Sequence, residues 1–278
     1  MFQKDLLQDK RILITGGGSG LGRAMAKRFA ELGAHVIVAA RREELLRETV
    51  AEIQAAGGRA SWHPLDIRVA SLCEEVVERI WSEGPLDVLV NNSAGNFAAR
   101  TETLSARALD SVLNPTLHGT LYMTVECGKR WIRDRRKGNV ISMVFSGASV
   151  GSAFTVPSAM SKAGMVAMTR SLAVEWGPKG IRLNAISPGA FPTKGAWDRL
   201  LPRPELAHEF ETNNPLGRPG RYDEVVHLAA FLAADGSEYI NGDVITIDGG
   251  QWLQGAGTFN FLRKLTDAEW DSMKPPKR

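Results

Sequence analysis

The sequence predicts an α/β fold built on a parallel sheet, and three observations lead to this prediction. Short apolar stretches of strand length, such as residues 11–15 and 86–90, alternate with longer stretches in which apolar residues recur at helical spacing. The strand stretches are apolar at nearly every position, which is typical of strands buried on both faces. A glycine-rich turn joins the first strand directly to the first helix. Strands separated by helices favour parallel pairing, with helices packed against the sheet.

Composition and charge are those of a soluble globular protein. Hydrophobic residues make up 44% of the 278 positions, charged residues make up 23%, and the net charge is +3. This mild charge gives no reason to expect a nucleic-acid partner. Because α/β sheets often reach this length as one unit, we expect a single domain over residues 1–278.

The sequence also suggests where the protein resides. It contains no run of about 18 apolar residues, so neither a membrane span nor a membrane partner is expected. Its two cysteines, Cys73 and Cys127, lie in helical stretches, which disfavours a disulfide framework and favours a reducing, cytoplasmic compartment. The first predicted strand begins at Arg11, so no signal or transit peptide is expected before it. No metal site is predicted.

The clearest ligand signal is the segment Gly16-Gly-Gly-Ser-Gly-Leu-Gly22, directly after the strand predicted over 11–15. Its glycines let the backbone turn tightly and approach a pyrophosphate, and the following helix presents free N–H groups to that charge. A plain tight turn is the alternative, and the order of strand, turn, helix and second strand disfavours it. The residues expected to bind the cofactor here are Gly16, Ser19, Gly20, Leu21 and Gly22.

The end of the second predicted strand, residues 35–40, indicates which dinucleotide binds. An NAD site places Asp or Glu there to hold the ribose 2′-hydroxyl. This chain has Ala40 followed by Arg41 and Arg42, and two guanidinium groups suit a 2′-phosphate. We therefore predict NADP(H) as the cofactor. The alternative is that both arginines are solvated residues at a helix start.

The ends of the third and fourth predicted strands complete the expected cofactor site. Asp66 either meets an adenine amino group or caps the helix that begins near Ser71. Asn91 and Asn92 either contact the cofactor or bridge neighbouring loops. We expect Asp66, Ile67 and Asn92 in the cofactor site.

Three motifs together resemble the short-chain dehydrogenase/reductase family. They are Thr15-Gly-x-x-x-Gly-x-Gly22, Asn91-Asn-x-Ala-Gly95 and Ser161-Lys-Ala-Gly164, and they occur in the family's order. The resemblance implies a doubly wound (Rossmann) sheet of about seven strands with helices on both faces. It implies a substrate lid over about 194–214, a tail over 255–278 and a homotetramer. It further implies cofactor contacts from Pro188, Gly189 and Thr193.

One part of that family's active site is missing. The family usually places Tyr four residues before Lys, and here Ser158 precedes Lys162. A serine hydroxyl is a far weaker acid than a phenol of pKa about 10, although it can hydrogen-bond a substrate carbonyl. In the family the lysine holds the nicotinamide ribose, and Ser142 stands where the catalytic Ser usually lies. A solvated lysine is the alternative for Lys162.

One branch of the family lacks that Tyr: the 2,4-dienoyl-CoA reductases. The chain resembles them at Ala94-Gly-Asn-Phe97, Val156-Pro-Ser-Ala159 and the tail segment Phe259-Asn-Phe-Leu-Arg-Lys264. The resemblance implies that NADPH reduces a conjugated C=C bond of a 2,4-dienoyl-CoA or related enoyl thioester. It places Arg68, Phe97 and Arg199 at substrate positions. As isolated arginines, Arg68 and Arg199 could equally be surface residues.

The resemblance weakens at the thioester carbonyl, where enolate charge develops and must be held by hydrogen-bond donors. The branch uses an Asn immediately before the Gly of the long helix and a Tyr fifteen residues before Lys. The corresponding residues here are His118 and Gly147. The family's usual active-site Asn is replaced by Thr116.

The long helix is predicted over 106–137, with a kink or a broken turn at Pro115. His118 and Tyr122 lie one turn apart on it and share a face. His118 is either a donor or acid for the substrate, or a structural residue, and Tyr122 or a water could supply the proton instead. The predicted catalytic residues are Lys162, Ser158, His118 and Tyr122.

Two other functions stay open from the sequence. The same fold and cofactor could serve a different carbonyl or ring compound. Alternatively, the chain could bind NADP without turnover, as a sensor or an oligomer partner, which the missing Asn and Tyr favour and the intact Lys162 disfavours.

Overall fold

The computed structural model describes residues 2–192 and 203–273 and contains a seven-stranded sheet in which all neighbouring strands are parallel. The strand order is β3-β2-β1-β4-β5-β6-β7, so the chain winds outward in both directions from β1 and β4. The strands are β1 (Arg11–Thr15), β2 (His35–Ala40), β3 (Arg59–Pro64), β4 (Val88–Asn91), β5 (Gly138–Met143), β6 (Ile181–Pro188) and β7 (Val244–Ile247). The predicted doubly wound fold is confirmed.

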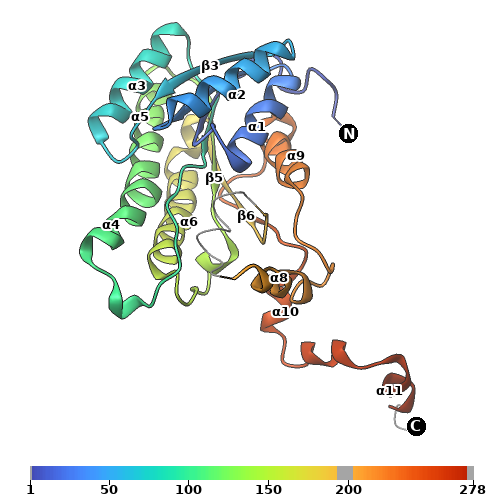
Figure 1. The fold of residues 1–278 in the computed structure, drawn as a ribbon. Helices are drawn as coiled ribbons and strands as arrows, with labels where there is room; N and C mark the ends of the chain where they lie inside the picture. Colours follow the sequence, from blue (N-terminus) through green and yellow to red (C-terminus); the bar gives the residue numbers. More distant parts are fainter. Residues whose placement is uncertain (1, 193–202, 274–278) are drawn as a thin grey trace.

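Helices cover both faces of this sheet (Figure 1). The longer ones are α1 (Gly20–Glu31), α2 (Glu43–Ala55), α3 (Ala70–Glu83), α4 (Ala106–Leu113), α5 (Gly119–Arg133), α6 (Val156–Trp176) and α9 (Tyr222–Ala233). Shorter helices are α8 (His208–Thr212), α10 (Gln251–Ala256) and α11 (Asp267–Ser272). No helix in the described ranges is long and apolar enough to cross a membrane.

Alternation along the strands divides the core into two layers. On β1, Ile12 and Ile14 join a cluster with α1, α2 and α9, whereas Leu13 joins the cluster with α3, α5 and α6. Successive side chains of a strand point to opposite faces, so an apolar residue at every position is needed to fill both layers. This is why the predicted strands are continuously apolar.

The helix predicted over 106–137 is divided in two. Between α4 and α5, residues Asn114–His118 form a single π-helical turn, in which the Gly119 N–H bonds to the Asn114 carbonyl. Pro115 has no N–H to donate, so the regular helical ladder cannot continue through it. The chain widens into one π-turn instead of kinking, and α5 ends at Arg133.

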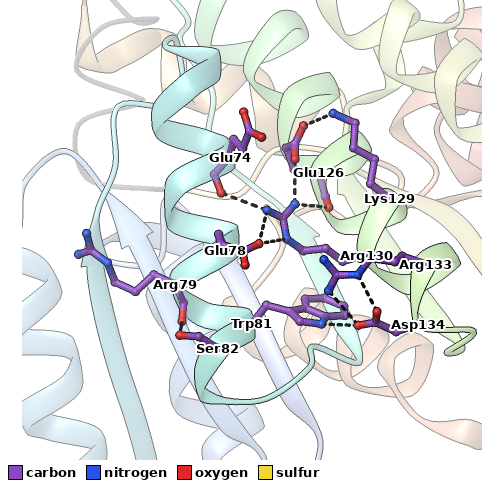
Figure 2. Close-up of polar contacts among 10 residues, drawn as sticks. All are labelled: Glu74, Glu78, Arg79, Trp81, Ser82, Glu126, Lys129, Arg130, Arg133 and Asp134. Atoms are coloured by element: carbon purple, nitrogen blue, oxygen red, sulfur yellow. Dashed lines mark hydrogen bonds and ion pairs between the residues drawn. The ribbon is translucent and has the colours of Figure 1, made fainter.

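A buried ion-pair cluster joins α3 to α5 on one face of the sheet (Figure 2). The Arg130 side chain is 7% exposed and its Nη2 lies 2.8 Å from Glu78 Oε2 of α3. Its Nη1 lies 2.8 Å from Glu126 Oε2, one turn earlier on α5. Nearby, Trp81 Nε1 donates to Asp134 Oδ2 at 2.7 Å. These bonds fix the two helices against each other without touching the carboxyl edge of the sheet.

The C-terminal segment extends away from the sheet as an arm (Figure 1). It contains α10, a 3₁₀ turn at Asn260–Lys264 and α11, whose first turn is closed by a capping box between Thr266 and Glu269. Arg263 Nη2 donates to the Thr212 carbonyl at 2.6 Å and ties the arm to α8. The tail predicted over 255–278 is therefore partly helical up to residue 273.

Candidate active site

The turn after β1 has the geometry of a phosphate-binding loop. Gly16 and Gly20 have φ angles of +69° and +53°, a conformation that favours glycine. A Cβ on Gly22 would lie 2.4 Å from the Gly16 carbonyl oxygen, so only glycine fits there. The first turn of α1 carries no acidic residue, which leaves its positive end for an anion. The residues present therefore fit a dinucleotide pyrophosphate.

Asn92 braces this turn. Its Nδ2 donates to the Thr15 carbonyl at 3.0 Å, and Thr15 Oγ1 accepts from the backbone N–H groups of Asn92 and Ser93. Of the two roles that the sequence leaves open for Asn92, the structure shows the loop-bridging one. A direct contact between Asn92 and the cofactor stays a prediction. Leu21, also predicted at this site, is partly buried against the core.

Arg41 and Arg42 lie at the carboxyl end of β2 and are both exposed. Arg42 Nη2 lies 3.4 Å from Ser19 Oγ, so one guanidinium group reaches the residue that precedes α1. Arg41 forms no ion pair with any residue of the described part of the chain. Arg42 is also the N-cap residue of α2, as the helix-start alternative requires. Its position beside Ser19 is compatible with both interpretations.

Asp66 and Arg68 bind each other. Arg68 Nε lies 2.8 Å from Asp66 Oδ1, and Arg68 Nη2 lies 2.5 Å from Oδ2, so both carboxylate oxygens are engaged. The Arg68 guanidinium keeps the pKa of Asp66 below its ordinary value. The helix-capping alternative for Asp66 is wrong, because the N-cap of α3 is Val69 and no side chain caps it. Ile67, between the two, is buried against Gly119.

Lys162 and Ser158 lie one turn apart on α6 and are both buried. Lys162 Nζ donates to the Met143 carbonyl at the end of β5, at 2.5 Å. Removal from water lowers the pKa of Lys162 to about 8. The hydroxyl of Ser158 forms no hydrogen bond to any described residue. A buried lysine whose charge no described carboxylate balances, beside a hydroxyl with no partner among the described residues, is the arrangement expected of groups that bind a ligand.

Ser142 is not placed where its interpretation as the family's catalytic Ser requires. It lies within β5, is fully buried, and pairs in register with Asn91 of β4. Its Oγ has no hydrogen-bond partner among the described residues. The strand continues to Met143, so Ser142 lies beneath the edge of the sheet and out of reach of a substrate.

His118 ends the π-turn, and Tyr122 lies one turn later on α5. His118 is exposed and its Nδ1 lies 3.0 Å from Asn114 Oδ1, while Tyr122 packs toward α3. Thr116 and Thr124, on the buried side, bond to Gly95 and Asn91. The π-turn packs against α6, where Leu117 lies beside Gly164. No hydrogen bond joins His118 or Tyr122 to Lys162 in the described part of the chain, and their catalytic roles stay predictions.

Asn96, within the segment Ala94-Gly-Asn-Phe97, is a further candidate site residue that the sequence pattern does not single out. Its side-chain oxygen is buried and has no partner among the residues that the structure describes. The preceding Gly95 is fixed to the π-turn by a 3.0 Å bond from its N–H to Thr116 Oγ1. The bond from Ala99 N–H to the Phe154 carbonyl, 2.9 Å, holds this loop to the one before α6. An unpaired buried amide was the missing signal, and no sequence pattern reports it.

The ends of β6 and β7 meet at Gly189. Its N–H bonds to the Ile247 carbonyl, and a Cβ there would lie 2.7 Å from Asp248 Cβ, so glycine lets the two strand ends approach. Pro188 is the last residue of β6. Phe97 is partly buried on the loop after β4. Thr193, Arg199 and part of the lid predicted over 194–214 lie outside the described residues.

A glycine-turn dinucleotide site, a doubly wound parallel sheet and a lysine on the helix after β5 define a nicotinamide-dependent oxidoreductase. A family model described as enoyl-(acyl carrier protein) reductase matches residues 16–251. A solved structure described as a short chain dehydrogenase from Bacillus anthracis is 40% identical, with a TM-score of 0.81, over 88% of this chain and 97% of that one. A variant of the actinorhodin polyketide ketoreductase, solved with NADPH, is 29% identical, with a TM-score of 0.82, over 91% and 99%. The chain belongs to the short-chain dehydrogenase/reductase family.

Two named relatives place the chain more narrowly. A Caenorhabditis elegans protein, "Probable 2,4-dienoyl-CoA reductase 3" ((3E)-enoyl-CoA-producing), is 41% identical over 276 residues, 96% of this chain and 89% of the relative. A Bacillus subtilis protein, "Probable 2,4-dienoyl-CoA reductase" ((2E)-enoyl-CoA-producing), is 42% identical over 249 residues, 89% of this chain and 98% of the relative. The chain is thus in the 2,4-dienoyl-CoA reductase-like branch, as the sequence resemblance implies.

Proposed function

We propose that this protein uses NADPH to reduce a conjugated C=C bond of a 2,4-dienoyl-CoA or a closely related enoyl thioester. The observation that carries the proposal is the buried pair Ser158 and Lys162, in which a serine stands where the family usually has the phenol of a Tyr. A reaction that protonates carbon does not require the phenol that a ketone reductase uses to protonate oxygen. The named relatives at 41% and 42% identity support the same substrate class.

Each site residue then has a chemical role. When bound, the cofactor supplies hydride to the far end of the conjugated system. Ser158 donates a hydrogen bond to the thioester oxygen as enolate charge develops there, and Lys162 supplies positive charge nearby while it is protonated. Since the pKa of Lys162 lies at about 8, this charge is present at neutral pH.

We further propose that Asn96, in place of His118, is the second donor to the thioester oxygen. A half-turn of its amide presents N–H₂ where the buried, unpaired oxygen now lies. His118 is exposed and bonds to Asn114, so we assign it a smaller part in holding the thioester oxygen than Asn96, and the roles of His118 and Tyr122 stay predictions. The proton added to carbon is assigned to water.

NADP(H) is the proposed cofactor form. Arg42 beside Ser19, and Arg41, which has no ion-pair partner in the described ranges, suit a 2′-phosphate at the end of β2. A relative in fold was solved with NADPH. Asp66 is proposed to accept from the adenine amino group and Arg68 to meet a phosphate of CoA, which requires that their ion pair open.

A homotetramer, a single domain and a cytoplasmic location complete the proposal. Helix α6 supports the tetramer, because Met160 and Val174 on its outer face are 59% and 79% exposed. Ala163 and Ala167 continue this apolar stripe at helical spacing, and such stripes mark contact surfaces. Cys73 and Cys127 are both free and buried, as is usual for a reducing compartment.

A panel of substrates tests the proposal. The protein is mixed with NADPH and, in separate reactions, a short 2,4-dienoyl-CoA, a 2-enoyl-CoA and a ketone, and the absorbances of cofactor and substrate are followed. Consumption of the dienoyl-CoA together with NADPH is expected. Turnover of the ketone alone would show that the site acts on another class of substrate. NADPH binding without any turnover would indicate a sensor and not an enzyme.

A further inference from the structure

Phe145 and Gly147, two residues apart in the loop after β5, fit together closely. The Phe145 ring lies over Gly147, so that a Cβ on residue 147 would fall 2.2 Å from Phe145 Cε2 and 2.6 Å from Cζ. Real Cβ atoms do not approach carbon this closely. Gly147 is not in the left-handed region, so its backbone alone would accept a side chain. The ring is therefore what requires glycine at position 147.

The pair is fixed in place beside the catalytic helix. Phe145 follows Val144, which is buried with Met165 and Val166 of α6. The carbonyl of Phe145 accepts from Ala148 N–H at 2.9 Å, and the carbonyl of Gly147 accepts from Gly151 N–H at 2.8 Å. Gly147 is buried, whereas the Phe145 ring is only partly buried. One part of the Phe145 ring thus packs against Gly147, and another part is accessible to solvent or to a ligand.

Phe145 stands on the loop that begins where Lys162 is held. Phe145 is two residues beyond Met143, whose carbonyl holds Lys162 Nζ at 2.5 Å. It also stands at the carboxyl edge of a parallel sheet, where ligands of such folds bind. A conjugated dienoyl thioester is planar and apolar, and aromatic rings bind such groups by offset stacking.

We propose that Phe145 is a specificity-determining residue that packs along the conjugated part of the acyl chain, and that Gly147 is required because it seats this ring. This inference rests on the proposed function. It means that the loop after β5 supplies an apolar wall to the substrate and no hydrogen-bond donor at position 147. It also means that residues 145 and 147 act as one unit in substrate binding.

Three variants test this unit: Phe145→Ala, Gly147→Ala and the double variant. Phe145→Ala is expected to raise KM for the dienoyl-CoA about tenfold. Gly147→Ala should raise KM similarly, because its methyl group displaces the ring. In the double variant the added methyl group has no ring to displace, so its KM should equal that of Phe145→Ala alone. Phe154→Ala, which removes a 63% exposed ring from the same loop, is the matched control and should keep the wild-type KM.

NADPH affinity and thermal unfolding show that each variant is folded, and both should match the wild type. An unchanged KM in Gly147→Ala, or effects that multiply in the double variant, would overturn the role of Phe145 while leaving the proposed function intact. If NADPH affinity fell by the same factor as KM rose, the role of Phe145 would also be overturned, because the substitution would then have damaged the whole site and not acyl binding alone. If wild-type protein consumes no dienoyl-CoA, the proposed function fails and the acyl role of Phe145 fails with it.

Discussion

Lys162 is buried, and the Met143 carbonyl oxygen, 2.5 Å from its Nζ, is its one hydrogen-bond partner among the residues that the structure describes. No carboxylate balances its charge in the described ranges, and loss of water is what lowers its pKa to about 8. A buried cation without a counter-ion destabilises a folded protein unless a ligand compensates for it. This position is therefore explained by binding and chemistry more readily than by stability.

Replacing Lys162 with Met should stabilise the cofactor-free protein while abolishing turnover. The pKa falls from 10.5 in the unfolded chain to about 8 in the folded one. That shift corresponds to about 3 kcal/mol against folding, from which about 1 kcal/mol is subtracted for the lost hydrogen bond. A net gain of about 2 kcal/mol at neutral pH is expected, measured by denaturant unfolding.

The same comparison has a defined pH dependence. Below the folded pKa of about 8, the lysine is charged in both states and its burial cost is fully present. Between about 8 and 10.5 the unfolded chain binds more protons than the folded one, so wild-type stability rises with pH relative to Lys162→Met. The difference in the free energy of unfolding between Lys162→Met and the wild type should therefore become smaller over this pH range. If this difference in the free energy of unfolding stayed constant from neutral pH to about pH 10, burial of the charged lysine would not be the cause of the lower wild-type stability.

Arg42 should discriminate between the two nicotinamide cofactors. Arg42→Ala is expected to weaken NADPH binding about tenfold and to leave NADH binding unchanged, because only NADPH carries the 2′-phosphate. Fluorescence titration measures both affinities. Arg47→Ala is the control: Arg47 is also exposed on α2, but its guanidinium lies over Trp62, at 5.0 Å from the ring centre. Equal losses for both cofactors would contradict a 2′-phosphate contact.

Asn96 and His118 can be compared directly. Asn96→Ala should lower kcat about a hundredfold if it donates to the developing enolate, whereas His118→Ala should leave kcat within about twofold of wild type. The physical difference is that Asn96 has a buried, unpaired amide end and His118 is exposed. Steady-state rates with a dienoyl-CoA decide between them. The reverse pattern would restore His118 to the site and remove Asn96.

Arg130 should be important for stability and not for chemistry. Arg130→Ala leaves the Glu126 carboxylate, 11% exposed, without its closest buried partner and is expected to cost about 3 kcal/mol. Arg133→Ala removes an exposed pair with Asp134 and should leave the free energy of unfolding nearly unchanged. Urea unfolding gives both values. Comparable losses in the two variants would show that burial of the Arg130 cluster contributes nothing.

The parts of the molecule governed by local rules were predictable from the sequence. The glycine turn is one case, because Gly16 and Gly20 adopt backbone angles that other residues rarely allow. The two-layer core is another, because continuous apolar strands have few arrangements other than a sheet covered on both faces. The break at Pro115 was also predictable, although its form as a π-turn depends on how α4 and α5 pack.

Roles transferred by counting positions are harder to predict. His118 precedes a helix glycine, as the resemblance requires, but the π-turn in which it lies could not be read from the count alone, and His118 is exposed there. Ser142 was placed at the end of a strand that continues by one residue, to Met143. The unpaired oxygen of Asn96 and the contact between Phe145 and Gly147 depend on tertiary geometry, which no linear pattern contains.

The most direct test of the central claim is the stoichiometry of turnover with a short 2,4-dienoyl-CoA and NADPH in excess. We expect that one NADPH is oxidised for each dienoyl group lost, that the product is an enoyl-CoA, and that Lys162→Met consumes neither NADPH nor the dienoyl-CoA. NADPH oxidation without loss of the dienoyl absorbance, or equal rates in Lys162→Met and wild type, would contradict this claim.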